Sequence, residues 1–269
     1  MTSIIVSQKQ NDKPKVAILM CVYNGEGHLK EQLDSLINQS IDKLDIWVSD
    51  DGSTDNSLKI LQSYKKSWSK GVFNIIEGPR QGFATNFLSL ICSHQIKADY
   101  FAYCDQDDIW EKDKIARGIG FLRASKGVPA LYCSRTSMIG ELGQNLNKMS
   151  PLFRKKPSFS NAIVQSLAGG NTMLLNVKAC QLIRSAGIQN IISHDWWTYI
   201  LVTGAGGSVF YDPKPLIKYR QHENNQIGLK VYNQKPLSWL WPLRVAVAMA
   251  HGWWATVAKP FNKHASGAF

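Results

Sequence analysis

The sequence predicts an α/β fold built on a mostly parallel, doubly wound sheet, and two observations support this prediction. Runs rich in apolar residues occupy positions 16–23 (VAILMCVY), 45–51 (DIWVSDD) and 100–104 (YFAYC). Apolarity that is continuous rather than alternating is typical of strands buried on both faces, as in a parallel sheet. Stretches with helical spacing of apolar residues separate these runs, and this alternation of strand and helix indicates a parallel sheet covered by helices.

The first half of the chain pairs each expected strand with an expected helix. The short run 73–76 (FNII) is the third of four strands. Ser53, Thr54 and Asp55 are candidate caps for the second helix, because short polar side chains accept hydrogen bonds from the free N–H groups of a first turn. The apolar residues that mark the helices are, in chain order, Leu29, Leu33, Leu36 and Ile37; Leu58, Leu61 and Tyr64; Phe83, Phe87, Leu88 and Ile91; and Ile115, Ile119 and Leu122.

The second half of the chain is less regular. We expect strands at residues 130–134, 171–177, 208–211 and 216–220, the last two joined by a turn that contains proline. Residues 193–202 (SHDWWTYILV) are expected to form a helix capped by Ser193.

Composition narrows the class of protein. The 269 residues are enough for one substantial domain or two small ones, and 44% hydrophobic with 19% charged residues describes a globular chain. The net charge of +11 suits an anionic partner such as nucleic acid, an anionic membrane or a phosphorylated substrate. No basic helix or recognition motif is present, so we expect no nucleic-acid partner. The five cysteines are widely spaced without a CxxC pair, which predicts reduced thiols in a cytosolic protein.

Polar clusters follow three of the expected parallel strands. They are Tyr23-Asn24-Gly25, Asp50-Asp51-Gly52-Ser53, and the acidic run from Asp105 to Asp108. In doubly wound sheets the binding crevice lies beyond the carboxyl ends of the strands, so the three clusters are expected to converge there.

The acidic run predicts a metal site. Alternate residues at a strand end point the same way, so Asp105 and Asp107 can approach one centre. Hard oxygen ligands suit Mg²⁺ or Mn²⁺, and Mg²⁺ is commonly held by one or two carboxylates with substrate phosphates completing its shell. The alternative is a helix N-terminus, where aspartate favours the macrodipole. Asp108 fits this alternative if a helix follows it.

Together these segments resemble the inverting family 2 glycosyltransferases, which have the GT-A fold. The resemblance rests on VYNGEGHLKEQLDSLINQS, VSDDGSTDNS, RQGFATNF and CDQDDIW, in that order, and extends over about residues 15 to 225. It implies that Tyr23, Glu26 and Asp50 or Asp51 bind the nucleobase and ribose. Asp105 and Asp107 fall on the Asp-X-Asp motif that holds the metal against the diphosphate. Arg80 and Gly82 fall in a loop close to the nucleotide.

The resemblance also implies a general base. Asp195 in ISHDWWTYI matches the catalytic carboxylate of the family, with His194 where an acidic residue usually stands. His194 could orient Asp195, bind the acceptor or only pack, and Asp195 could instead be a second capping residue. Trp196 and Trp197 are expected either to form a platform for a sugar or to pack in the core. The resemblance places Gly169, Gly170 and Asn171 near the donor phosphates and the acceptor. His222 is expected to be a further metal ligand or a structural histidine, and Arg220 is expected to offset the charge of the diphosphate.

DQDDIW, HDWW and YRQHENN look most like bacterial rhamnosyltransferases of polysaccharide assembly. This resemblance implies a metal-dependent transfer of L-rhamnose from dTDP-L-rhamnose to a glycan or lipid-linked acceptor. The alternatives are another nucleotide sugar, such as a UDP-hexose, and a non-catalytic module that binds a nucleotide or glycan.

Three segments are expected along the chain. Residues 1–14 form a loose leader without signal-peptide features, 15–230 form the GT-A domain, and 231–269 form a C-terminal helical segment. Within the last segment, tryptophans flanked by basic residues suit a helix lying on an anionic membrane surface. The alternative is a helix packed on the catalytic domain or on a second copy in a homodimer. We therefore expect a cytoplasmic protein, peripheral on the inner face of the cytoplasmic membrane.

Overall fold

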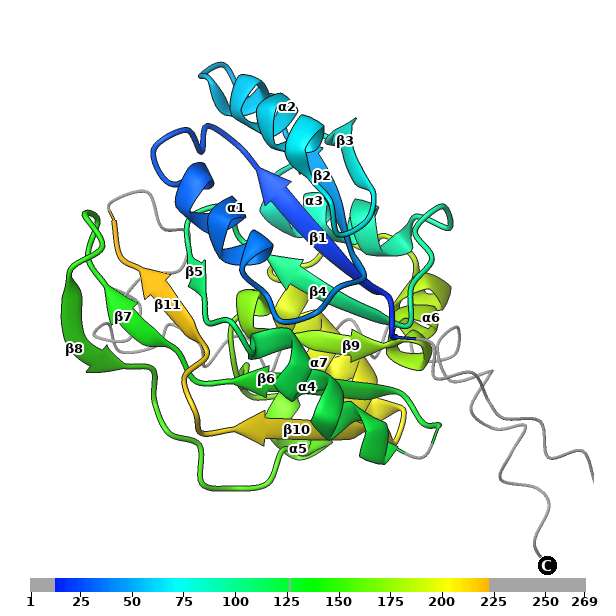
Figure 1. Cartoon of the computed structure of the whole chain (residues 1–269). Helices are drawn as coiled ribbons and strands as arrows, with labels where there is room; N and C mark the ends of the chain where they lie inside the picture. The colour runs from blue at the N-terminus through cyan, green and yellow to red at the C-terminus, as the bar shows by residue number, and fades with distance from the viewer. Residues whose placement is uncertain (1–12, 126, 223–269) are drawn as a thin grey trace, which may run out of the picture.

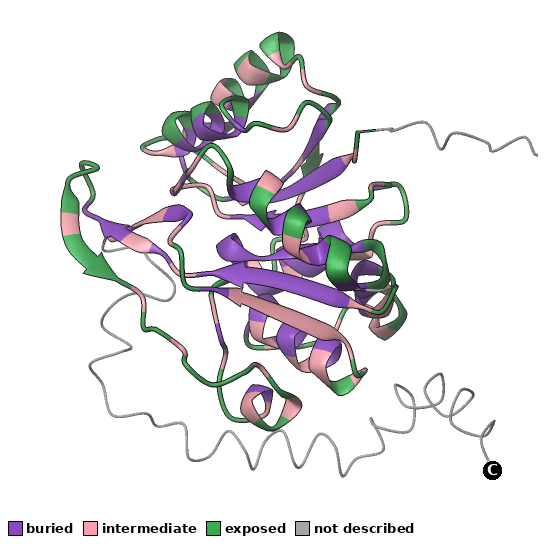
Figure 2. Ribbon diagram, turned by 60° about the horizontal axis from the view of Figure 1, so that its bottom comes forward, coloured by how far each residue is buried: buried purple, intermediate pink, exposed green. Residues whose placement is uncertain are grey.

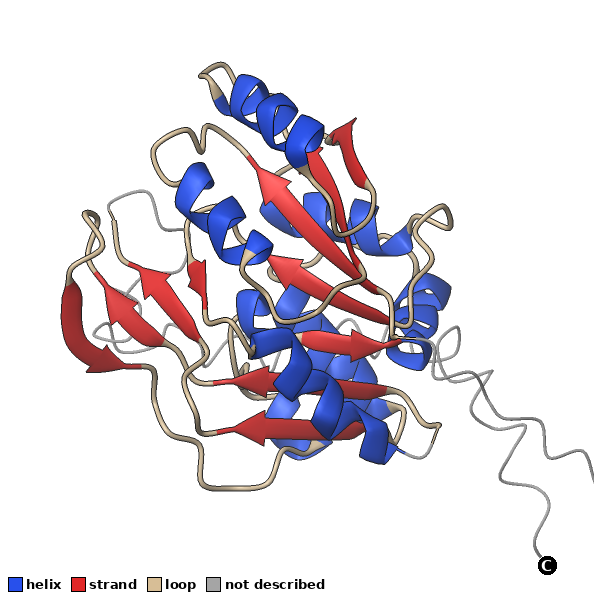
Figure 3. Ribbon diagram, viewed as in Figure 1, coloured by secondary structure: helices blue, strands red, loops and turns tan. Residues whose placement is uncertain are grey.

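The computed structural model describes residues 13–125 and 127–222, which form two sheets with helices around them (Figures 1 and 3). The strands are β1 (Val16–Val22), β2 (Leu44–Asp50), β3 (Phe73–Glu77), β4 (Tyr100–Cys104), β5 (Ile109–Trp110), β6 (Ala130–Ser134), β7 (Ser137–Ile139), β8 (Asn145–Met149), β9 (Leu174–Asn176), β10 (Ser208–Asp212) and β11 (Ile217–Arg220). The α-helices are α1 (Leu29–Ile37), α2 (Ser57–Ser67), α3 (Phe83–Cys92), α4 (Lys114–Leu122), α5 (Phe159–Ala162), α6 (Val177–Ala186) and α7 (His194–Gly204).

The larger sheet has seven strands in the order β10-β6-β9-β4-β1-β2-β3. β1 lies between β2 and β4 and pairs with both in parallel, and β3 continues the parallel arrangement beside β2. This order confirms the doubly wound half predicted from residues 16 to 122. The carboxyl ends of β1, β2 and β4 therefore meet at one edge of the sheet, as the crevice prediction requires.

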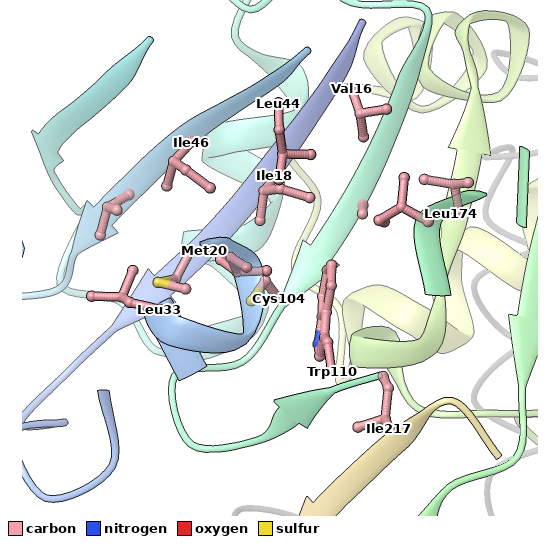
Figure 4. Packing of buried hydrophobic residues seen from close by; sticks show 14 of the residues in the cluster. Val16, Ile18, Met20, Leu33, Leu44, Ile46, Cys104, Trp110, Leu174 and Ile217 are labelled. Atoms are coloured by element: carbon pink, nitrogen blue, oxygen red, sulfur yellow. The ribbon is translucent and has the colours of Figure 1, made fainter. Parts of the chain in front are cut away.

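Both faces of the larger sheet are buried, which explains the continuous apolar runs. Alternate residues of β1 point to opposite faces: Val16, Ile18 and Met20 join the core beneath α1, α2 and α4, whereas Ala17 and Leu19 join the core beneath α3, α6 and α7. Figure 4 shows the first of these cores. All five side chains are fully buried, so a strand that is apolar at every position follows from helices on both faces.

The middle of the chain departs from the expected pattern. Instead of one strand at 171–177, a short 3₁₀ turn (Gly170–Thr172) precedes β9, and α6 starts immediately after β9. β9 runs antiparallel to β4 and β6, so the sheet is mixed. The Asn176 side chain ends the strand because its carboxamide oxygen accepts the Ala179 N–H at 2.9 Å and caps α6.

A second, four-stranded sheet in the order β5-β11-β7-β8 was not expected. The two strands predicted at 208–211 and 216–220 lie in different sheets, because β10 pairs with β6 while β11 pairs with β5 and β7. Trp110 and Ile217 face each other across β5 and β11 and extend the core into this sheet (Figure 4). Its edge strand β8 is largely exposed (Figure 2).

Three predicted helix starts differ from the structure. No helix begins at Asp108, since β5 follows it and α4 starts only at Lys114. Ser193 is the N-cap residue of α7, but its side chain makes no capping bond. At α2 the N-cap residue is Asn56, not one of the three predicted residues, and its side chain makes no capping bond. Asp55, one position earlier, accepts the Ser57 N–H at 2.9 Å.

Several predictions concern residues outside the described ranges. The leader and the C-terminal segment lie there except for residues 13 and 14, so the segment boundaries and the interfacial helix stay predictions. Within residues 13–222, no helix is long and apolar enough to cross a bilayer. All five cysteines are free thiols.

Candidate active site

The loops after β1 and β2 are joined by hydrogen bonds between main chain and side chains. The Asn24 carboxamide oxygen accepts the Thr54 N–H at 2.8 Å, and the Asn24 N–H donates to the Ser53 hydroxyl at 2.9 Å. The Glu26 carboxylate accepts the Asn56 N–H at 2.6 Å and the Asn56 side-chain amide at 3.0 Å. These bonds hold Glu26 against the start of α2, where its negative charge also favours the helix N-terminus.

The two aspartates that end β2 organise the neighbouring loops. Buried Asp50 accepts the Ser53 N–H at 3.2 Å and its hydroxyl at 2.5 Å, which tightens the turn after the strand. Asp51 accepts the Arg80 N–H at 2.6 Å and so joins the loop after β3 to the loops after β1 and β2. These three loops, with Tyr23, Asp50, Asp51 and Arg80, are called the nucleotide corner below. Arg80 and Gly82 both have positive φ, of 57° and 86°. The structure thus brings the predicted nucleotide-binding segments together.

Tyr23 is an exposed aromatic residue in the loop after β1. Its side chain is 59% exposed, which is unusual for a large aromatic residue and leaves the ring free to stack on a planar ligand. Its main chain is fixed by Gln106, whose carboxamide accepts the Tyr23 N–H at 2.8 Å and donates to the Tyr23 carbonyl at 3.1 Å.

Gln106 is a residue that the sequence analysis did not single out. Besides pairing with Tyr23, its carboxamide oxygen lies 2.5 Å from the place where a Cβ on Gly25 would be. A side chain at position 25 would therefore displace the Gln106 carboxamide from its hydrogen bonds with Tyr23. In the sequence, Gln106 is marked only by its position between Asp105 and Asp107, and that position does not indicate that it pairs with Tyr23.

The carboxylates of Asp105 and Asp107 lie near one another, as predicted. Burial raises the pKa of Asp105, and the negative charges of Asp107 and then Asp195 raise it further. The Asp107 carboxylate lies 2.7 Å from Nε2 of His222, and this hydrogen bond raises the pKa of His222. The site therefore concentrates negative charge that a cation would stabilise.

These side chains fit a divalent cation by their chemistry. Carboxylate oxygens are the preferred ligands of Mg²⁺ and Mn²⁺, and the His222 imidazole beside Asp107 offers a nitrogen atom as a further ligand. In the described part of the chain, no three His, Cys, Asp or Glu side chains are gathered as a complete metal cage. A cation that takes one or two protein carboxylates and completes its shell with substrate phosphates does not need such a cage.

Asp108 belongs to a different network from its neighbours. It is fully buried and accepts the Arg220 N–H at 3.1 Å and the Asn171 side-chain amide at 2.5 Å. The interpretation of Asp108 as a helix start is therefore wrong, because no helix follows it and its carboxylate binds segments from the other half of the chain.

Arg220 is held by the protein itself. Its side chain is fully buried, forms an ion pair with Glu31 at 2.7 Å, and donates to the carbonyls of Asp107 at 2.9 Å and Glu141 at 2.8 Å. This corrects the expectation that Arg220 offsets the diphosphate charge, because the guanidinium N–H groups point into these bonds. Arg220 instead anchors β11 beneath the acidic motif.

Asp195 lies in the first turn of α7 and is buried. Its carboxylate accepts the Gly170 N–H at 3.0 Å, the Trp196 N–H at 2.6 Å and the Ser193 hydroxyl. The Gly170 N–H binds Asp195 and the side chain of the next residue, Asn171, binds Asp108, so Asp195 lies near the acidic run; its charge also contributes to the raised pKa of Asp105. The structure thus brings the predicted base and the predicted metal ligands to one site, although they are about 90 positions apart in sequence.

His194 is buried in an aromatic box. Its ring stacks on Phe87 with the centroids 3.9 Å apart and meets the Tyr103 ring edge-on at 4.7 Å. Neither ring nitrogen has a hydrogen-bond partner in the described part of the chain. Of the three roles considered for His194, packing is the one that these contacts support, and it does not orient Asp195 through a hydrogen bond.

The buried histidine should make stability depend on pH. Burial lowers the pKa of His194 from 6.5 to about 4, so between these values the unfolded chain binds a proton that the folded chain does not. Stability therefore rises with pH across this window, and the His194 contribution lost between pH 7 and pH 5 is about 2 kcal/mol. We expect His194→Phe, which keeps an aromatic ring in the box, to lose less stability over this range in urea titrations. Equal losses in both proteins would contradict a neutral, buried His194.

The tryptophans after Asp195 have structural contacts. Trp197 is 8% exposed and belongs to the core beneath α3, α6 and α7, so its role as a sugar platform is not supported. Trp196 is partly buried and donates its indole N–H to the Ala162 carbonyl at 2.6 Å. At Gly170, a Cβ would lie 2.3 Å from Nε2 of His194, so the missing side chain makes room for protein rather than for a ligand.

Sequence comparison points in one direction. The sequence model described as Glycosyl transferase family 2 matches residues 17–182. The dTDP-rhamnosyl transferase RfbG of Shigella flexneri is 32% identical over 221 residues, which is 79% of this chain and 74% of that protein. The putative teichuronic acid biosynthesis glycosyltransferase TuaG of Bacillus subtilis is 24% identical over 233 residues, 85% of this chain and 87% of that protein.

Solved structures agree on the fold. The structure of S. aureus TarS 1–349 in complex with UDP-GlcNAc has a TM-score of 0.64 and 17% sequence identity, and covers 94% of this chain and 73% of that one. The mannosyltransferase PcManGT from Pyrobaculum calidifontis, in complex with GDP-Man and Mn2+, has a TM-score of 0.58 and 15% identity, and covers 96% of this chain and 77% of that one. At these identities the likeness concerns the fold alone.

Proposed function

The chain belongs to glycosyl transferase family 2 and has the GT-A fold, and on this premise we propose that it is a metal-dependent, inverting rhamnosyltransferase. In this proposal L-rhamnose passes from dTDP-L-rhamnose to a hydroxyl of a glycan or lipid-linked acceptor. The observation that carries the chemistry is the buried Asp195 carboxylate close to the acidic cluster of Asp105 and Asp107. The rhamnosyl assignment is supported by the similarity to RfbG.

Asp195 is proposed as the general base. An ionised carboxylate offers about four lone-pair sites, and three are used by the N–H groups of Gly170 and Trp196 and the hydroxyl of Ser193. The remaining site can accept the proton of an acceptor hydroxyl as that oxygen attacks the anomeric carbon. The three donors also fix the carboxylate in one orientation, which reduces the reorganisation needed during the reaction.

The leaving diphosphate is proposed to lie beside Asp105, Asp107 and His222. These residues would hold a divalent cation, which when bound supplies Lewis-acid stabilisation of the developing negative charge. The exposed Tyr23 ring and the loops of Asp50, Asp51 and Arg80 would receive the nucleoside. Contact with an anionic membrane surface, through residues 237–264, remains a proposal that rests on the sequence of that segment.

A thermal-shift experiment tests the donor. The purified protein is heated with dTDP-L-rhamnose, dTDP, UDP-glucose or UDP-GlcNAc, each with Mn²⁺, with Mg²⁺ and with EDTA. A ligand at about 100 times its Kd adds about 2.7 kcal/mol to the stability of the fold, which corresponds to a Tm increase of about 5–10 °C in a domain of this size. We expect this increase for dTDP and dTDP-L-rhamnose in the presence of a metal.

The outcomes separate the alternatives. A larger Tm increase with a UDP-sugar than with dTDP-L-rhamnose would identify the UDP-sugar as the donor, and the protein would still be a glycosyltransferase. Stabilisation without either hydrolysis of the donor or transfer to an acceptor extract would favour the non-catalytic binding module. No shift with any nucleotide in either metal would contradict the proposed site.

A further inference from the structure

We propose that the turn at Gly169–Asn171 is a fixed link that sets the separation between the acidic donor motif and Asp195, with Asp108 as the positioning residue at one end. This inference rests on the proposed function, because it assigns a task within the same site. It concerns Asp108, whose buried carboxylate binds Asn171 and Arg220.

One end of the link is the contact between Asn171 and Asp108. The Asn171 side-chain amide donates to Asp108 at 2.5 Å, and both residues are buried, at 3% and 0% exposure. Water therefore cannot easily replace either partner, and a buried carboxylate left without a donor is costly. Asp108 directly follows Asp107, so whatever fixes Asp108 also fixes the position of that proposed metal ligand.

The other end is the contact between Gly170 and Asp195. The Gly170 N–H donates to the Asp195 carboxylate at 3.0 Å. Gly170 and Asn171 are adjacent in the chain, so two successive residues of one short turn bind Asp195 and Asp108. A planar peptide bond joins these residues, and such a connection has little freedom to change length.

The conformation of the turn depends on its two glycines. A Cβ on Gly170 would lie 2.3 Å from the His194 ring, and a Cβ on Gly169 would lie 2.9 Å from the Asn171 carboxamide oxygen. His194 therefore occupies the space beside Gly170 and supports the turn. This gives the buried, unprotonated ring of His194 a function in the link that does not need a hydrogen bond.

Asp108 also connects to the strand that leads to His222. Its second oxygen accepts the Arg220 N–H at 3.1 Å, and the Arg220 side chain donates back to the Asp107 carbonyl at 2.9 Å. His222, two residues after Arg220, contacts the Asp107 carboxylate at 2.7 Å. The Asp108 carboxylate thus ties together the acidic motif, the strand before His222 and the turn that reaches Asp195.

The direction of the Asp108–Asn171 hydrogen bond provides a sharp test. Asn171→Asp places two carboxylates against each other and removes the donor. Asp108→Asn together with Asn171→Asp restores the pair with donor and acceptor exchanged, while the carboxamide oxygen introduced by Asp108→Asn still accepts the Arg220 N–H. Asp108→Asn alone is the permissive variant, since turning the Asn171 amide restores a hydrogen bond. Asn145→Asp, on the exposed strand β8, is the matched control for the change of an amide to a carboxylate.

We expect Asn171→Asp to lower kcat for transfer by about 10–100-fold, the range typical of residues that orient catalytic groups. Its Kd for dTDP measured in EDTA, without metal, should change less than about threefold, since the loops proposed to receive the nucleoside are built from other segments. The double variant should recover kcat to within about threefold of the wild type, and Asn145→Asp should match the wild type. Unchanged kcat in Asn171→Asp, or no recovery in the double variant, would overturn the link.

A second readout does not depend on turnover. The Gly170 N–H is protected by Asp195, so its hydrogen exchange measured by NMR should become about tenfold faster in Asn171→Asp and return toward the wild-type rate in the double variant. If the wild type shows no transfer with any nucleotide sugar, the proposed function fails, and this exchange experiment still decides whether the link exists. Equal exchange rates in all variants would refute it.

Discussion

Replacing Asp195 with asparagine is expected to lower the kcat for sugar transfer by about 10²–10⁴-fold, the usual contribution of a general base. Asparagine has nearly the same shape and can still accept the Gly170 N–H, so the turn and α7 should keep their positions. It cannot take a proton from the acceptor hydroxyl. The measurement is initial-rate kinetics of dTDP release and glycan extension with saturating donor.

Binding should survive this substitution. The nucleotide corner is formed by the loops of Tyr23, Asp50 and Asp51, whose hydrogen bonds go to Gln106, Ser53 and Arg80 rather than to Asp195. The Kd for dTDP should therefore stay within about threefold of the wild type. Asp42→Asn is the matched control, because Asp42 is an exposed aspartate that pairs with Lys13 away from the site. Wild-type turnover in the Asp195 variant would show that another group is the base.

Replacing Asp107 with alanine is expected to abolish transfer and the metal-dependent part of nucleotide binding. Asp107 contacts His222 at 2.7 Å and adds to the charge felt by Asp105, so its removal leaves too few donors to hold a divalent cation beside a diphosphate. Loss of several kcal/mol of transition-state stabilisation corresponds to a decrease in kcat of about 10³-fold or more. Isothermal titration of Mn²⁺ into the dTDP complex measures the loss directly.

The thermal stability of the same variant provides the control. The Asp107 carbonyl, which accepts from the Arg220 side chain, remains in the alanine variant. The fold should therefore stay intact, with a Tm without ligands near that of the wild type. A variant that keeps metal-enhanced dTDP binding would show that Asp107 is not a ligand, and the assignment would then move to Asp105 or to another group.

The acidic motif contains residues that look alike in sequence but have different partners in the structure. In sequence the motif looks like a single cluster of Asp105, Gln106, Asp107 and Asp108. The only local distinction among them is that successive side chains at a strand end point in opposite directions. In the structure Asp107 contacts His222, Gln106 pairs with Tyr23, and Asp108 binds Asn171 and Arg220. The partners of Asp108 are 63 and 112 positions away, so no local signal could assign them.

Arg220 and His194 show the same limit for residues chosen by resemblance. Both occupy positions where a polar side chain suggests a contact with substrate. The structure buries both, Arg220 with Glu31 and three carbonyl groups, and His194 between aromatic rings. A charged or polar side chain can be used by protein or by ligand, and only the surrounding segments decide which.

The sequence by itself determined the parallel half of the sheet, the edge at which its polar loops gather, and the family. The sheet and its edge depend on local periodicity and on the fixed geometry of parallel strands, whose carboxyl ends must share one edge. The family followed from the resemblance of four motifs in order along the chain. Only the tertiary structure decided the second sheet, the antiparallel strand β9 and the different partners within the acidic motif, where Asp107 contacts His222 while Asp108 binds Asn171 and Arg220. Those features arise from hydrogen bonds between segments far apart in the chain, and a buried donor or acceptor takes the partner that folding brings to it.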